Sequence, residues 1–307
     1  MESVSPSLDP GPVALLVVAL ALYARATVVL RRRGRRVSVA QQAAWYAGLA
    51  LLAVALVGPL DALASRLLSA HMAQHVAVAD LAVPLMLIGL RTPVLMFYAP
   101  RPVLVAVARR TWVRRAFATL SRPLVAVPLY IATLYLWHLG YMFEGALRSG
   151  ALHALQHLSF IFTSALVWWA PLEPGRLRVG GELWKAGHVL AARLGGTMLG
   201  MAFLAMRAPA YDDFYGDAAR AFGLTPLADQ QIGGALMMIV DLVVMLGALG
   251  FFFWRAAADD DAGEQGRADG RRGPLPGAPQ PPSSSSLTRS NSTSAPSASA
   301  GSSSLSP

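Results

Sequence analysis

The chain has 307 residues, of which 55% are hydrophobic and 14% charged, and its mean hydropathy is +0.47. A soluble domain of this length carries far more surface charge, so the composition excludes that class and predicts an all-α membrane protein. The absence of cysteine excludes a disulfide scaffold, a thiolate metal site and a cysteine nucleophile. The net charge is +9, but the arginines gather beside apolar segments, as topology signals do, which argues against nucleic acid as a partner.

Seven apolar segments have the length of roughly 20 residues that a bilayer core requires. They cover residues 13–30, 42–60, 71–90, 124–141, 153–172, 186–206 and 227–254. Pro84 predicts a kink in the third segment, because proline cannot donate the helical hydrogen bond. A basic, partly amphipathic stretch, residues 91–122, precedes the fourth segment.

The loops predict one orientation in the membrane. Arginine and lysine gather after the first, third and fifth segments, whereas the longest intervening loop carries Asp212, Asp213 and Asp217. Because basic loops stay in the cytoplasm, we expect the N-terminus outside and the C-terminus in the cytoplasm, in the inner (plasma) membrane of a bacterium and in contact with its lipid. The first basic block follows the first apolar segment, so we expect no cleavable signal peptide.

After Arg255 the composition changes to serine, proline, glycine and small charged residues. Such a stretch buries too little apolar surface to offset the entropy of ordering its chain. We therefore expect two parts: a seven-helix transmembrane domain, residues 1–255, and a disordered cytoplasmic tail, residues 256–307.

Two motifs of the form His-x-x-Gln-His open the third and fifth segments. They place His71 with His75, and His153 with His157, on one face of a helix and one turn apart. With His138 at the end of the fourth segment, five of the six histidines fall at the same side of the membrane. Neutral imidazole binds copper, zinc, iron and nickel well, so we interpret these five as metal ligands.

Neighbouring polar residues fit supporting roles. We expect Gln74, Gln156 and Asp229 to accept hydrogen bonds that fix the tautomers of the imidazole rings. Asp80, a little over one turn beyond His75, is expected at the floor of the site. Methionines near the same helix ends, without any thiolate, favour copper over zinc. Each histidine or methionine alone also fits an interface anchor or a packing residue, and it is the repeated motif that favours the metal site.

Arg193 and Asp241 fall deep inside the sixth and seventh segments. At 1.5 Å per residue, Asp241 lies on the order of 18 Å from the outer end of its segment. An unpaired charge at that depth is costly, so we predict an ion pair between the two side chains. The pair either locks the packing of the helices or takes part in proton or ion passage. Glycine pairs at 195–196 and 233–234 predict close contact between these two segments.

Four segments carry a family resemblance: HMAQH at 71–75, LWH at 136–138, ALHALQH at 151–157 and LADQQ at 227–231. Together they resemble the CtaG family, the seven-span assembly factors of caa3-type cytochrome c oxidase, over residues 13–254. The sequence departs from the family where Ile239, and not tryptophan, follows two methionines. The resemblance implies an assembly factor that binds copper at the five histidines, with Asp229 in the functional set, and delivers the copper to a cytochrome c oxidase subunit.

Two other functions stay open on the sequence. A haem-binding membrane electron carrier also uses histidine pairs on facing helices, and a metal-ion transporter also needs ligands in its spans. Against the first, only His188 lies at the opposite membrane face; against the second, few polar residues continue through the membrane. No arrangement of a nucleophile with a base is recognisable, so we expect the protein not to be an enzyme.

Overall fold

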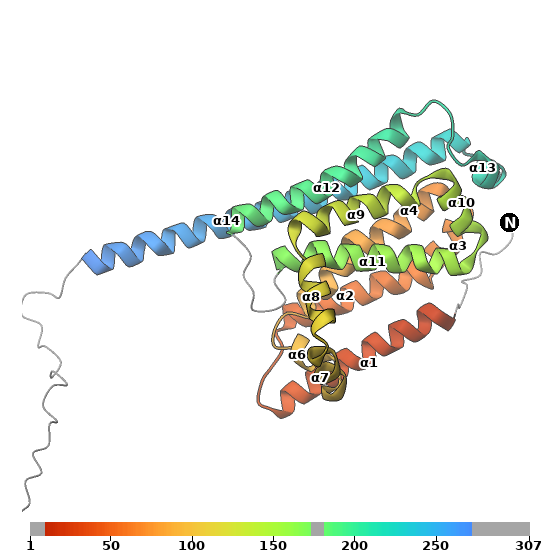
Figure 1. Ribbon diagram of the computed structural model, residues 1–307. Coiled ribbons are helices and arrows are strands. Elements are labelled where there is room, and N and C mark those ends of the chain that lie inside the picture. The colour runs from red at the N-terminus through yellow and green to blue at the C-terminus, as the bar shows by residue number, and fades with distance from the viewer. Residues whose placement is uncertain (1–9, 173–180, 272–307) are drawn as a thin grey trace, which may run out of the picture. The chain divides into compact units, whose positions relative to one another are not determined.

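The computed structural model describes residues 10–172 and 181–271, which form α-helices and one π-helix (Figure 1). In chain order these are α1 Pro10–Arg32, α2 Val39–Leu56, α3 Pro59–Ala64, α4 Leu68–Val76, η1 Ala77–Ala82 (the π-helix), α5 Val83–Gly89, α6 Leu95–Tyr98, α7 Arg101–Arg109, α8 Thr111–Leu120, α9 Pro123–Trp137, α10 Gly140–Arg148, α11 Gly150–Leu172, α12 Glu182–Ala205, α13 Asp212–Ala221 and α14 Pro226–Arg271. No strand occurs in these residues. The expected all-α fold is confirmed.

Within the described residues, six helical segments are long and apolar enough to cross a membrane. They are Pro10–Arg32, Val39–Leu56, Leu68–Gly89, Gly150–Leu172, Glu182–Ala205 and Pro226–Ala258. A seventh span results if α8 and α9, which are bent by 76° where they meet, are counted as one. Pro123 opens α9 at this bend, where its missing N–H and fixed φ suit a new helix start. The predicted orientation of these spans stays a prediction.

The third span is not one regular helix. It consists of α4, the π-helix η1 and α5, and the Val83 N–H bonds to the carbonyl of Val78, five residues earlier. Pro84 lies in the first turn of α5 and has no N–H for the carbonyl of Asp80, four residues before it. The irregularity predicted at Pro84 therefore takes the form of a π-helical turn that precedes it.

Glycines allow close approach of two helix pairs. A Cβ on Gly200 of α12 would lie 2.8 Å from the carbonyl oxygen of Gly234 on α14, closer than real Cβ atoms come. The same holds between α2 and α5, where a Cβ on Gly89 would lie 2.6 Å from the Cβ of Trp45. The predicted close contact between the sixth and seventh spans is confirmed.

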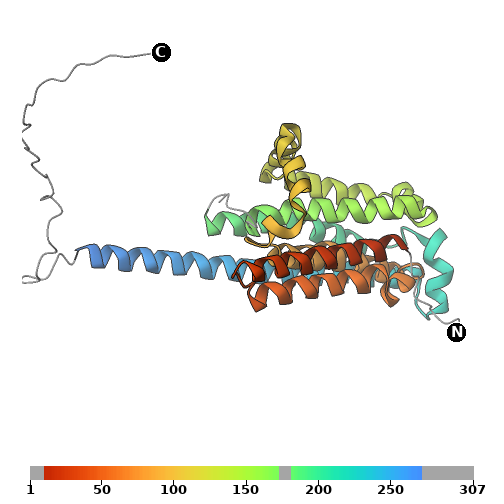
Figure 2. The same ribbon diagram turned by 90° about the horizontal axis from the view of Figure 1, so that it is seen from below.

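The predicted amphipathic stretch forms the short helices α6, α7 and α8. None of the residues of α7 or α8 is buried, although both contain exposed apolar side chains such as Val103 and Trp112. In Figure 2 these two helices project from the side of the bundle. An exposed apolar face beside basic residues is typical of a helix at a membrane surface.

Three other short helices, α3, α10 and α13, lie at one end of the bundle, beside the first turns of α4 and α11 (Figure 1). Phe143 of α10, Tyr215 of α13 and Tyr211, which precedes α13, belong to the largest buried apolar cluster. This end of the bundle is therefore enclosed by protein, and it is the end to which the His-x-x-Gln-His motifs bring their histidines.

The helix of the last span continues past residue 255, where the sequence predicts the tail to begin. Contacts divide the chain into two units, Met1–Asp259 and Asp260–Pro307, and α14 continues through Arg271. Residues 256–271 of the predicted tail are therefore helical, and the division into a transmembrane domain and a disordered tail stays a prediction. The remainder of the predicted tail, residues 272–307, lies outside the described residues.

Candidate functional site

Four histidines from two helices meet at this end of the bundle. On α4, the ring centroids of His71 and His75 are 4.3 Å apart, and on α11 those of His153 and His157 are 4.4 Å apart. Between the helices, the rings of His71 and His153 are separated by 5.4 Å. Those of His75 and His157 are separated by 5.1 Å. The two motifs therefore face each other, and we name this group the four-histidine cluster.

A tyrosine from α13 orients the ring of His71. The hydroxyl oxygen of Tyr215 lies 2.9 Å from the carbonyl oxygen of Ala64 and 3.1 Å from His71 Nδ1. Burial raises the pKa of Tyr215, so the phenol keeps its single proton. A carbonyl only accepts, so Tyr215 donates to Ala64 and His71 Nδ1 donates to the hydroxyl oxygen. His71 Nε2 is left with a lone pair and has no hydrogen-bond partner among the described residues.

The other rings of the cluster also present lone pairs. His153 Nε2 and His157 Nε2 are 2.9 Å apart, so one proton is shared between these two nitrogens. In the part of the chain that the structure describes, His157 Nδ1 and both ring nitrogens of His75 are buried without a hydrogen-bond partner. Each unsatisfied buried polar atom costs about 1–3 kcal/mol. A bound cation would satisfy the lone pairs among them.

The fifth predicted ligand, His138, lies beside the cluster rather than in it. Its ring centroid is 6.4 Å from that of His75. Its Nδ1 is 2.7 Å from the carbonyl oxygen of Leu134 and donates to it, whereas Nε2 lies 3.4 Å from the sulfur of Met72. The hydroxyl of Tyr211, the residue before α13, donates to the carbonyl oxygen of His138 at 2.6 Å and holds the backbone at the end of α9.

Two of the three residues predicted to fix the ring tautomers make hydrogen bonds to other groups. The amide of Gln74 donates to Asp61 at 2.8 Å. Asp229 accepts from the backbone N–H of Leu68 at 2.7 Å and so caps the first turn of α4. Gln156 is fully buried, and neither atom of its amide has a hydrogen-bond partner in the described ranges. In the described residues a tyrosine hydroxyl and a main-chain carbonyl orient the rings of His71 and His138, and the supporting roles expected of Gln74, Gln156 and Asp229 stay predictions.

Deeper in the bundle, the predicted ion pair is present. Arg193 Nη1 lies 3.0 Å from Asp241 Oδ1, and the same nitrogen contacts Asp80 Oδ1. The Tyr130 hydroxyl donates to Asp80 at 3.0 Å. The side chains of the three charged residues are only 1%, 10% and 5% exposed, for Arg193, Asp80 and Asp241, so they rely on one another for charge compensation. We name them the charged triad.

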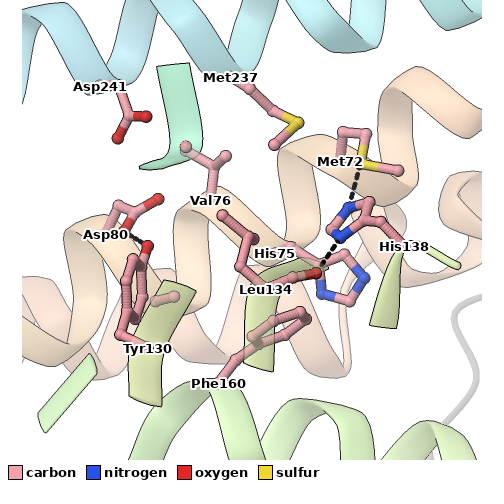
Figure 3. A pocket seen from close by; sticks show the side chains of 12 residues that line it. Met72, His75, Val76, Asp80, Tyr130, Leu134, His138, Phe160, Met237 and Asp241 are labelled. Carbon is pink, nitrogen blue, oxygen red and sulfur yellow. Dashed lines mark hydrogen bonds between the residues drawn. The ribbon is translucent and has the colours of Figure 1, made fainter. Parts of the chain in front are cut away.

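A small cavity of about 20 Å³ joins the histidines to the charged triad. Figure 3 shows His75, His138 and Met72 at one end of it, and Asp80 and Asp241 at the other. It has room for about one water molecule. Asp80, predicted at the floor of the metal site, lines this space while it pairs with Arg193. We call this space the inner cavity.

The donor atoms suit a metal ion, but they are not arranged as in a loaded site. Among the residues that the structure describes, no group of three or more histidine, aspartate or glutamate side chains has the geometry to hold a metal. The cluster nevertheless fits the chemistry of a borderline metal, since its rings offer buried lone pairs with no hydrogen-bond partner in the described part of the chain. The shared proton between His153 and His157 occupies a place that a cation could take.

Sequence reasoning missed the tyrosines of the site. Tyr211 and Tyr215 are four residues apart between the sixth and seventh spans, a helical spacing that could have revealed one face directed at the histidines. Tyr130 lies within an apolar span, and nothing in the sequence separates it from an ordinary buried aromatic residue. The remaining histidine, His188, lies away from the cluster and donates from Nε2 to the carbonyl oxygen of Val167 at 2.8 Å.

Similarity to known proteins covers most of the chain. Residues 21–259 match the family described as cytochrome c oxidase caa3 assembly factor. Uncharacterised proteins of Mycobacterium bovis and Mycobacterium tuberculosis are each 28% identical over 232 residues, which is 71% of this chain and 34% of theirs. The chain thus spans about a third of the length of the curated relatives it matches. No solved structure matches.

The family match begins within α1 and extends to the end of the first unit at residue 259, so it includes part of the first candidate span, all the later ones and every residue of the proposed site. The helices mark a multi-pass membrane protein, and the relatives are bacterial. The chain belongs to the family of caa3-type cytochrome c oxidase assembly factors, the CtaG family.

Proposed function

We propose that this chain binds copper at the four-histidine cluster and His138 and passes it to a subunit of the oxidase whose assembly its family serves. The observation that supports this most is the set of buried ring nitrogens that have no hydrogen-bond partner within residues 10–172 and 181–271: His71 Nε2, His157 Nδ1 and both nitrogens of His75. Apolar packing alone gives no reason to bury imidazoles in this state, because each unsatisfied atom is destabilising. A metal ion bound between α4 and α11 would satisfy the lone pairs.

Copper is the cargo that the available donors fit best. The sequence offers imidazole and thioether but no thiolate, and Met72 lies against the ring of His138. Such a site would be a carrier and not an enzyme, since the histidines would all be used as ligands. We place the protein in the inner membrane of a bacterium, with the cluster on the outer side, as the loop charges predict.

The geometry argues against haem as the ligand. The rings of the cluster are 4.3 to 5.4 Å apart, and the cavity beside them measures about 20 Å³, far too little for a porphyrin. A visible absorption spectrum of the purified protein gives the direct check. A Soret band in protein purified from its native membrane would contradict the copper proposal.

The test compares the metal content of the full chain in detergent with that of His71→Ala/His75→Ala and His153→Ala/His157→Ala. His188→Ala is the matched control, because this histidine lies away from the cluster. We expect copper in the wild type and in the control, and its loss from both double variants. Copper that is absent from the wild type, or that persists in both double variants, would overturn the proposal and favour a scaffolding role.

Delivery to the oxidase is tested in cells. In a bacterium that lacks its own copy of this factor, wild-type protein should restore copper to the caa3-type oxidase, whereas either double variant should not. A double variant that restores oxidase copper fully, at equal membrane abundance, would separate assembly from copper binding at the cluster.

A further inference from the structure

Two atoms without protons face each other at the end of α9. The Nδ1 of His138 donates to the carbonyl oxygen of Leu134, so in the neutral ring Nε2 carries only a lone pair. The atom opposite Nε2 is the thioether sulfur of Met72, 3.4 Å away, which also has no hydrogen to donate. Neither atom can therefore stabilise the other. Both are soft or borderline donors, and a cation between them would be bound by both.

The same space is lined by two further donors. Met237 reaches it from α14, and His75 reaches it from α4 (Figure 3). Met72, Met237 and His75 are 1%, 6% and 6% exposed, so these donors are withdrawn from water and lipid. Both ring nitrogens of His75 are without a hydrogen-bond partner among the described residues. Four side chains from three helices thus surround the histidine end of the inner cavity.

The charged residues at the other end of the inner cavity favour a monovalent cation. Asp80 and Asp241 share the single guanidinium of Arg193, so the formal charges of the triad leave one carboxylate unbalanced. In a low-dielectric interior this imbalance favours a cation nearby. A monovalent cation compensates one carboxylate, whereas a divalent cation would leave a net positive charge buried in the bundle, which is costly.

We propose that the inner cavity is a binding site for one Cu(I) ion, with Met72, Met237, His138 and His75 as its ligands. The identity of the ion rests on the proposed copper function, which already takes His75 and His138 as ligands. Met72 and Met237 are the ligands that this site adds to the four-histidine cluster and His138. Soft thioether donors select the monovalent, polarisable ion over Zn(II). His75 belongs to both groups, so it links the cluster near the end of the bundle to the cavity that lies deeper.

The test uses the full chain in detergent, loaded under reducing conditions with Cu(I), with Ag(I) as a monovalent ion that does not change oxidation state, and with Zn(II). The variant is Met72→Leu/Met237→Leu, which conserves side-chain volume and is therefore expected to fold. Met198→Leu/Met201→Leu is the matched control, since these methionines are 44% and 43% exposed. X-ray absorption at the copper edge reports sulfur around the ion independently of any variant.

We expect copper–sulfur scattering in the wild type and in the control, and its loss in the Met72→Leu/Met237→Leu variant. Affinity for Cu(I) and Ag(I) should fall in that variant by about tenfold or more, the scale seen when the surroundings of a metal site are altered, while Zn(II) binding is unchanged. Wild-type copper without sulfur neighbours, or unchanged Cu(I) affinity in the variant, would overturn this inference. If His153→Ala/His157→Ala then still lost copper, the proposed function would survive. A wild type that takes up neither copper nor silver would overturn both.

Discussion

Replacing Arg193 by methionine tests whether the charged triad is a unit. Arg193 is 1% exposed and contacts both Asp80 and Asp241, so Arg193→Met leaves two carboxylates buried without a counter-charge. Breaking a buried ion pair in this way typically costs about 3–5 kcal/mol. For a domain of this size, each kcal/mol lowers the melting temperature by roughly 2–4 °C, so we expect a fall of about 6–20 °C.

The assay is thermal unfolding of the detergent-solubilised full chain, followed by tryptophan fluorescence at a fixed scan rate. Adding Asp80→Asn and Asp241→Asn to Arg193→Met should recover most of the loss, because no uncompensated charge then remains. Arg220→Met is the control: it also removes an arginine paired with two aspartates, but its side chain is 55% exposed. Surface pairs contribute about 0–1 kcal/mol. If Arg193→Met melted no lower than Arg220→Met, or if the asparagines gave no recovery, the reasoning from charge compensation would be refuted.

Two further substitutions test the packing and the tautomer arguments. Gly196→Ala should destabilise the protein by about 1–3 kcal/mol in the same assay, because the new Cβ would collide with the Asp241 carboxylate. Gly187→Ala on the same helix is the control. A Cβ there meets nothing within 4 Å, so this variant should not be destabilised. Tyr215→Phe removes the hydroxyl that accepts from His71 Nδ1, so copper affinity should fall by about 10–100-fold in equilibrium competition with a chelator. Unchanged copper affinity in Tyr215→Phe would show that the phenol does not fix the tautomer of His71.

The spans were predictable because hydropathy depends on length and composition, which the sequence states directly. The depth of a residue also follows from counting, and this is why the pairing of Arg193 with Asp241 could be predicted. The rotation of each helix does not follow, because an apolar span surrounded by lipid has no polar face to mark its direction. Asp80 was therefore expected at the floor of the metal site, and its contact with Arg193 was not foreseen.

The histidines of the site were easier to predict from the sequence than the groups that orient their rings. A spacing of four residues places two rings on one helical face whatever the rotation of the helix. The sequence alone therefore predicted the two histidines of each motif to be neighbours, but it could not show that the two motifs meet. The partners that orient the rings come from elsewhere: Tyr215 from a short helix in a loop, and the carbonyl oxygen of Leu134 from the main chain. Side chains such as Gln74 were the natural candidates by sequence, but neighbours on the same helix point along its own surface and not toward the next ring.

The π-helix explains how one span serves both the histidine cluster and the charged triad. In a regular helix with 3.6 residues per turn, His75 and Asp80 would be separated by about 140° around the axis and could not both face one small space. The structure has both on the wall of the inner cavity, with η1 beginning between them at Ala77. Hydrogen bonds that reach back five residues widen the turn, so residues five apart come closer to the same face. Pro84 has no N–H to donate to the carbonyl of Asp80, so it interrupts the regular α-helical hydrogen bonds. The proline therefore favours the π-helical turn that brings His75 and Asp80 to one cavity.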